Sequence, residues 1–181
     1  MAHFAVTAFG ADRPGIVAAV TRVFVDLGCN LEDTSMTILR GHFAMMLVVE
    51  APPGVGAAEL ESGLASPASA LDLVVAVRPI PELAPEAVGA EAGRGWTVSV
   101  YGADRPGIVA GVAGLLAEES MNIVDLDTRV IGEPDRPVYA MILDVALPAG
   151  ADPQALDRRL QAVASELGVT ATLHPSEADI L

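Results

Sequence analysis

The sequence predicts two small domains of the α+β class in tandem, and three observations lead to this expectation. The segment Phe-Gly-Ala-Asp-Arg-Pro-Gly-Ile-Val-Ala at residues 9–18 recurs at residues 101–110 with only its first residue changed. Strand-like and helix-like patterns surround both copies in the same order. A segment rich in Pro, Ala and Glu at residues 79–94 carries no strand pattern and separates the halves. Since the repeat is too long for a solenoid unit, it indicates a duplicated domain.

The first half reads as a strand, a helix, two strands, a helix and a strand. The opening strand is rich in β-forming residues and closes at Gly10. In the helix that follows, Pro14 occupies the first turn, apolar residues recur at the helical period, and Gly28 is a natural cap. Arg40-Gly41 turns the chain between the second and third strands. The elements span, in order, residues 3–9, 14–27, 30–39, 43–49, 57–64 and 71–77.

The second half repeats this order, with elements at residues 96–101, 106–119, 121–131, 138–147, 153–167 and 169–173. Its last helix has the clearest ends, because Asp152 is a good N-cap, Pro153 suits the first helical position and Gly168 ends the pattern. The βαββαβ order predicts ferredoxin-like sandwiches with strand order 4-1-3-2 and two helices on one face. We expect a first domain at residues 1–78, a linker at 79–94, a second domain at 95–175 and an acidic tail at 176–181.

The composition excludes several classes of protein. The net charge is −14, and the chain has 10 Arg residues and no Lys. Such a surface repels polyanions, so we expect no direct contact with nucleic acid or a membrane. No apolar run approaches the ~20 residues of a membrane span, and no basic leader precedes the first strand. Because the single Cys29 excludes a disulfide framework within the chain, we expect a cytoplasmic protein.

Motifs of catalysis and metal binding are absent from the sequence. It contains no GxGxxG, no phosphate-binding loop, no HExxH and no CxxC. His3, His42 and His174 stand apart, and a metal site would need them to meet from separate strands. Three charged groups are better explained as solvated faces: Glu118-Glu119, Asp125 with Asp127, and Arg158-Arg159. We therefore expect no enzyme activity, no metal ion and no cofactor.

The repeated segment has the chemistry of a carboxylate site. The amides of Gly15, Ile16 and Val17 are unpaired donors at the positive end of a helix, and the glycine has no side chain to keep a ligand away. We expect Asn30 and Asp33, at the start of the next strand, to lie near this loop and to bind an ammonium group. Together these groups match the two ends of a free amino acid.

An ordinary strand–turn–helix connection is the alternative explanation. In that case Asp12 only caps the helix, and Asn30 only adopts a left-handed turn after Gly28. Two matching copies favour binding, because two independent helix starts could have had many acceptable sequences.

The same segment resembles the opening of the ACT domain: Gly-Ala-Asp-Arg-Pro-Gly-Ile-Val-Ala, an amphipathic helix, and then Asn-Leu or Asn-Ile at the start of a strand. The tandem arrangement is similar to the glycine cleavage system transcriptional repressor family, which has two ACT domains and no DNA-binding domain. The signature also opens the formyltetrahydrofolate deformylase and one class of phosphoserine phosphatase. ACT domains of this kind bind amino acids at domain–domain interfaces, through the first loop and the start of the second strand.

The resemblance implies one ligand site in each half. The first would consist of Asp12, Arg13, Gly15, Ile16, Asn30 and Leu31, and the second of Asp104, Arg105, Gly107, Ile108, Asn122 and Ile123. Asp33 and its counterpart Asp125 join these sites as candidate ligands of the ammonium group.

We expect a non-catalytic regulatory protein that senses a small amino acid of the glycine or serine class. It would act through a protein partner, a transcription factor or an enzyme, and form a homodimer. A small ligand is favoured because branched side chains leave little room beside the glycines: Ile16, Leu31, Ile108 and Ile123. One alternative is a detached regulatory module related to the deformylase or the phosphatase. A remote one is an RNA-binding protein of the same element order, which would need exposed aromatics and a basic surface.

Overall fold

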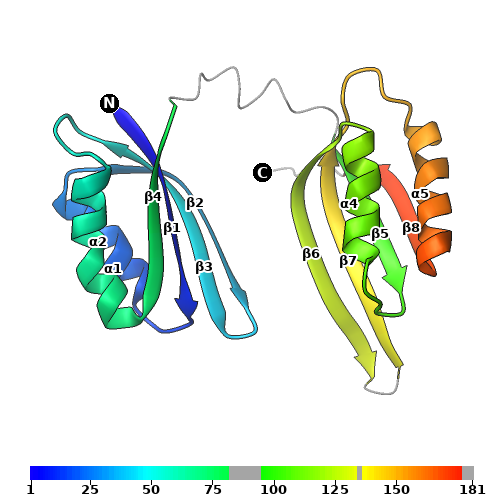
Figure 1. Cartoon of the computed structure of the whole chain (residues 1–181), viewed down its shortest axis with the longest axis horizontal. Coiled ribbons are helices and arrows are strands. Elements are labelled where there is room, and N and C mark those ends of the chain that lie inside the picture. The colour runs from blue at the N-terminus through cyan, green and yellow to red at the C-terminus, as the bar shows by residue number, and fades with distance from the viewer. Residues whose placement is uncertain (82–94, 134–135, 177–181) are drawn as a thin grey trace. The chain divides into compact units, whose positions relative to one another are not determined.

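The computed structural model describes residues 1–81, 95–133 and 136–176. The chain divides into two compact units, Met1–Leu83 and Ala84–Leu181. Each unit is a four-stranded antiparallel sheet with two helices on one face (Figure 1). This confirms the predicted fold class, two ferredoxin-like βαββαβ sandwiches in tandem.

The first unit consists of β1 (Ala2–Ala11), α1 (Ile16–Asp26), β2 (Asn30–Leu39), β3 (His42–Ala51), α2 (Ala57–Leu71) and β4 (Leu73–Ile80). The second consists of β5 (Gly95–Gly102), α4 (Ile108–Glu118), β6 (Asn122–Glu133), β7 (Arg136–Ala146), α5 (Pro153–Leu167) and β8 (Val169–Pro175). The sheet orders are β2-β3-β1-β4 and β6-β7-β5-β8, which is the predicted order in both units.

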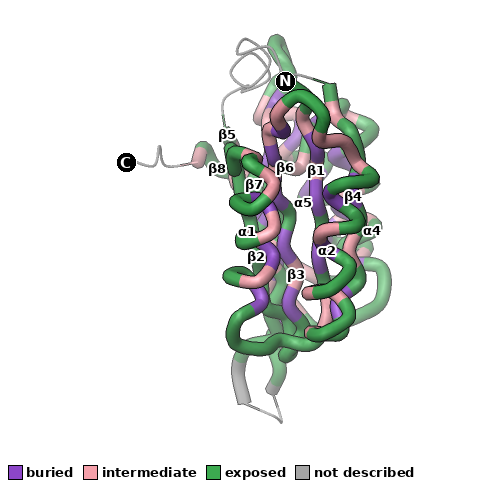
Figure 2. Tube along the Cα trace, turned by 90° about the vertical axis from the view of Figure 1, so that its left-hand side faces the viewer, coloured by how far each residue is buried: buried purple, intermediate pink, exposed green. Residues whose placement is uncertain are grey.

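Strand alternation separates a buried face from an open face in the first sheet. Along β3, every second residue is buried: Phe43, Met45, Leu47, Val49 and Ala51. These side chains form one core with buried residues of α1 and α2. Figure 2 shows the buried positions along β1 and β3, beneath the two helices. The edge strand β2 is exposed along its whole length.

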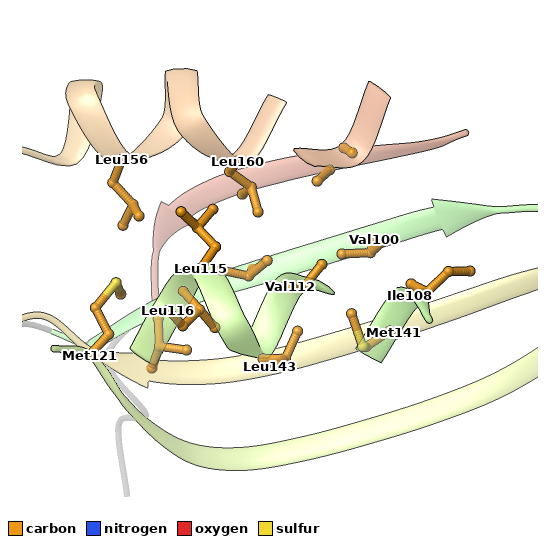
Figure 3. Packing of buried hydrophobic residues seen from close by; sticks show 14 of the residues in the cluster. Val100, Ile108, Val112, Leu115, Leu116, Met121, Met141, Leu143, Leu156 and Leu160 are labelled. Carbon is orange, nitrogen blue, oxygen red and sulfur yellow. The ribbon is translucent and has the colours of Figure 1, made fainter. Parts of the chain in front are cut away.

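The second unit has an equivalent core of aliphatic side chains. Figure 3 shows how residues of α4, α5 and the strands converge, among them Leu115, Leu160 and Met141. The predicted ends of α5 are confirmed, since Asp152 caps the helix by accepting a hydrogen bond from the Gln154 amide at 2.9 Å.

Three helix boundaries differ from the prediction. The helices α1 and α4 begin two residues later than expected, because Gly15 and Gly107 have φ of 95° and 98° and cannot be helical. Pro14 therefore lies in the turn rather than in the first helical position. The helix α2 continues through Pro67 to Leu71, whereas the sequence predicted an end at residue 64.

Arg159 contacts Glu118 and Glu119, although the sequence placed both charged groups on solvated faces. Its guanidinium group lies 2.6 Å from the Glu118 carboxylate and also pairs with Glu119, so it joins α5 to α4. Both ion pairs are exposed to solvent, so each contributes no more than about 1 kcal/mol.

The first glycine of the repeat has a packing role in both units. Gly10 lies within β1, and a Cβ atom there would be 2.7 Å from the Asp72 carbonyl oxygen. At Gly102 a Cβ atom would be 2.7 Å from a methyl group of Val169. These glycines therefore allow the start of the last strand to approach closely, and neither has a positive φ.

Replacing Gly10 by Ala should lower the free energy of unfolding by about 1 to 3 kcal/mol, because the backbone of β4 must move aside. Gly114→Ala is the matched control, since no atom lies within 4 Å of a Cβ there and Ala favours the interior of α4. It should stabilise by about 0.5 to 1 kcal/mol. Urea denaturation measures the free energy of unfolding of both variants. If Gly10→Ala and Gly114→Ala change it equally, the packing role of Gly10 is refuted.

Candidate functional site

The repeated loop of the first unit leaves the beginning of α1 without a side-chain cap. Gly15 is the N-cap residue, and no side chain accepts a hydrogen bond there. Its carbonyl accepts from the Ala19 amide at 2.9 Å, the first bond of the helical series. The amides of Ile16, Val17 and Ala18 precede that bond and lie at the positive helix end, where a carboxylate is stabilised.

A pocket of about 440 Å³ opens beside this helix end. Its lining comes from the loop, the first turn of α1 and the neighbouring strands: Asp12, Arg13, Gly15, Ile16, Val17, Ala18, Met36 and Phe43. A Cβ atom on Gly15 would meet no atom within 4 Å, so the space beside the glycine is open. The structure thus brings the four predicted loop residues together around one opening.

The pocket carries one charge of each sign. Asp12 and Arg13 are both exposed. Across residues 1–81, 95–133 and 136–176, neither side chain takes part in an ion pair. A guanidinium and a carboxylate that are free of protein partners can bind the carboxylate and the ammonium of one small zwitterion.

Asn30, Leu31 and Asp33 do not lie at this pocket, which corrects the expectation from the sequence. Asn30 pairs with Glu50 at one end of β3, whereas the Asp12 amide donates to the Gly41 carbonyl at the other end. Eight residues of β3 separate these ends, a distance of about 26 Å. The helix α1 carries the chain back along the sheet, so the next strand begins far from the loop.

Two further details of the predicted site change. Ile16 and Ile108 are each only 2% exposed and pack in the cores, so they do not narrow the space beside the glycines. The Asp33 carboxylate accepts a hydrogen bond from the Thr34 amide at 2.7 Å, next to a bulge in β2. One of its oxygens thus has a local structural partner.

The second loop repeats the geometry of the first. Gly107 is the N-cap residue with φ 98° and no side-chain cap, and its carbonyl accepts from the Gly111 amide at 2.8 Å. Asp104 and Arg105 are exposed beside it. The strand-start residues again lie away from the loop, since Asn122 pairs with Ala146 whereas Gly102 pairs with Tyr139. Ile123 and Asp125 follow Asn122 on β6.

The two loops differ in the residues beneath them. By strand register, Thr128 and Tyr139 occupy the positions of Met36 and Phe43. Burial, followed by the negative charge of Asp104, raises the pKa of the Tyr139 hydroxyl. This hydroxyl therefore remains a hydrogen-bond donor at neutral pH, and the second loop has more polar surroundings than the first.

Two models of the family described as ACT domain match the chain, at residues 2–78 and at residues 96–164. The chain is a tandem ACT-domain protein. It is 29% identical to the glycine cleavage system transcriptional repressor of Escherichia coli (strain K12), over 95% of this chain and 89% of that protein. The crystal structure of an unknown protein from Galdieria sulphuraria has a TM-score of 0.79 at 27% identity, and the match covers 97% of this chain and 99% of that one.

A UPF0237 protein of Methanopyrus kandleri is 41% identical over 78 residues, which are 41% of this chain and 87% of that protein. The resemblance to the ACT domain and to the repressor family, inferred from the repeated segment, is confirmed by these comparisons. None of the helices within the described residues is long and apolar enough to cross a membrane.

Sequence analysis missed Met36 and Phe43 in the pocket of the first ACT domain. Both follow the alternating pattern of a strand, which indicates a core position and carries no sign of a ligand. Cys29 is half-buried at the border of the first core, and burial raises the pKa of its thiol. The thiol therefore stays protonated at neutral pH.

Proposed function

We propose that this tandem ACT-domain protein is a non-catalytic regulator that binds a small amino acid and signals its presence to a protein partner. The loop pocket carries this proposal, because uncapped helix amides, a free Arg13 and a free Asp12 surround one opening. The ligand carboxylate would accept hydrogen bonds from the amides of Ile16 and Val17 and from Arg13. Its ammonium group would pair with Asp12.

The choice of a glycine or serine class ligand rests on the relative's name, not on the pocket size. A volume of about 440 Å³ is within the range that holds small-molecule ligands, so it would also admit a larger side chain. In the second domain, the hydroxyls of Thr128 and Tyr139 would favour a ligand with its own hydroxyl.

The residues at the start of β2 and β6 can reach a ligand in the loop pocket if they come from a second copy of the chain. Asn30 and the loop lie at opposite ends of one sheet, so they contact the same ligand only if another molecule supplies one of them. We propose a homodimer in which Asn30 and Leu31 of one copy approach the loop of the other. In the second domain, Asn122 and Ile123 would have this role.

The protein partner would carry the regulatory output. A net charge of −14 opposes direct contact with nucleic acid, so the regulated process, if it is transcription, would be reached through a transcription factor. We place this action in the cytoplasm, in keeping with a chain whose single cysteine forms no disulfide framework.

Calorimetry with glycine, serine and phenylalanine tests the ligand class. We expect binding of glycine or serine in preference to phenylalanine, together with a rise in the melting temperature. At a ligand concentration ~100 times the dissociation constant, native-state binding adds about 2.7 kcal/mol of stability. Tighter binding of phenylalanine than of both small amino acids would reject the class, and no binding of any free amino acid would reject the sensor.

A further inference from the structure

A cluster of His3, Glu32 and Glu50 lies on the open face of the first sheet, at the end away from the loop pocket. These residues belong to β1, β2 and β3, and one ligand atom of each lies within 4.8 Å of the others. The His3 Nε2 atom is 3.5 Å from the Glu32 Oε2 atom. An imidazole nitrogen and two carboxylate oxygens thus converge from three strands.

Strand register accounts for this meeting. His3 on β1 pairs directly with Glu50 on the neighbouring β3. On the other side of β3, a bulge between Leu31 and Asp33 leaves Glu32 without a pairing partner in the ladder. A bulge re-aims a side chain, and here it accompanies a glutamate that reaches His3 across the middle strand.

Within the protein, the polar and charged groups of this cluster have few favourable partners. The His3 side chain is only 12% exposed, and its Nδ1 atom is buried with no hydrogen-bond partner in the described part of the chain. An ion held by Nε2 would leave this Nδ1 atom unpaired, so a cation is favoured by the meeting of Nε2 with two carboxylates and not by Nδ1. Glu32 and Glu50 also bring two negative charges close together, which a cation would offset.

The second domain shows that the fold does not need this cluster. In its sheet, Gly95 and Ala146 are paired at the positions of His3 and Glu50. Val124 lies in the bulge at the position of Glu32. None of these three residues has a side chain that can bind a metal. The duplicated sheet therefore forms without the cluster, and the first domain carries it for another reason.

We propose that His3, Glu32 and Glu50 bind one divalent transition metal ion, with Zn²⁺ as the best match. Zinc accepts one imidazole and two carboxylates, and bonds of about 2.0 to 2.2 Å place tetrahedral ligand atoms about 3.4 Å apart. The observed 3.5 Å between His3 and Glu32 agrees with this spacing. Imidazole disfavours Mg²⁺ and Ca²⁺. Such an ion would fasten the exposed edge strand β2 to the central strand β1.

Zinc titration of the full chain, stripped with a chelator and free of a histidine tag, tests this site. We expect one Zn²⁺ per chain and slower amide hydrogen exchange at the start of β2 when zinc is bound. His3→Ala and Glu32→Gln should each weaken zinc binding by at least about tenfold. His174→Ala, which removes an exposed histidine of β8, should bind as the unaltered protein does.

Glu32→Gln keeps the test valid if His3→Ala fails to fold, because residue 32 is exposed and its replacement has the same shape. Two results would overturn the site: no zinc binding by the unaltered chain, or zinc binding that neither variant weakens. The site does not depend on the amino acid pocket, so loss of amino acid binding would leave this result unchanged.

Discussion

Replacing both Asp12 and Asp104 by Asn should weaken amino acid binding about ten- to hundredfold and leave the melting temperature of the free protein unchanged. Each substitution removes a charged partner of the ligand ammonium, which costs about 1.5 to 3 kcal/mol. Both aspartates are exposed, and neither caps the helix that follows its loop, so folding should lose little. Calorimetry measures the affinity, and thermal unfolding measures the stability.

Glu61→Gln is the control, because it removes an exposed acid of α2 that does not line the pocket. It should bind the ligand as the unaltered chain does. If the double Asp variant binds the amino acid with unchanged affinity, the repeated loop is an ordinary strand–turn–helix connection and not a ligand site.

Mixing two variants tests the homodimer. A chain with Asp12→Asn and Asp104→Asn keeps its strand starts, and a chain with Asn30→Gly and Asn122→Gly keeps its loops. If the ligand contacts both regions from different copies, each variant alone binds weakly and the mixed dimer regains intact sites. Asn30 and Asn122 begin strands and have no positive φ, so neither forms the left-handed turn of the alternative explanation. Thermal unfolding must therefore show that the Asn→Gly chain is folded before its weak binding is assigned to a lost ligand contact. A mixture that binds no better than its components would contradict the shared site.

Replacing Leu160 by Ala should lower the free energy of unfolding by about 2 to 5 kcal/mol, the largest stability effect that we expect. Leu160 is a residue of α5 that is 0% exposed, and its side chain packs in the core with residues of α4 and the second sheet (Figure 3). The substitution leaves a cavity that the surrounding side chains fill only in part. A loss of this size is a large share of the 5 to 15 kcal/mol that stabilises a typical domain.

Leu126→Ala provides the matched control, since it removes the same atoms from a side chain that is 40% exposed on β6. Its cost should be no more than about 1 kcal/mol. Urea denaturation compares the two variants. Similar losses would mean that burial, as the structure assigns it, does not decide the stability of this domain.

The sequence by itself determined the element order, the duplication and the family. The helical period after Pro14 and Pro106, the alternation along β3, and the ends of α5 at Asp152 and Gly168 depend on neighbouring residues, so they can be read along the chain. The repeated loop was recognisable for the same reason, because its residues act on one helix end within a few positions. The uncapped amides lie one residue later than predicted, at Ile16, Val17 and Ala18, because Gly15 itself is the N-cap.

Only the tertiary structure decided which distant residues meet. It placed Asn30 about 26 Å from the loop, because α1 returns the chain along the sheet before β2 begins. It assigned Gly10 to close packing against β4, since contact with Asp72 depends on strand pairing. It also brought His3, Glu32 and Glu50 together from three strands. Register and a single bulge set these contacts, and neither leaves a pattern that local sequence can reveal.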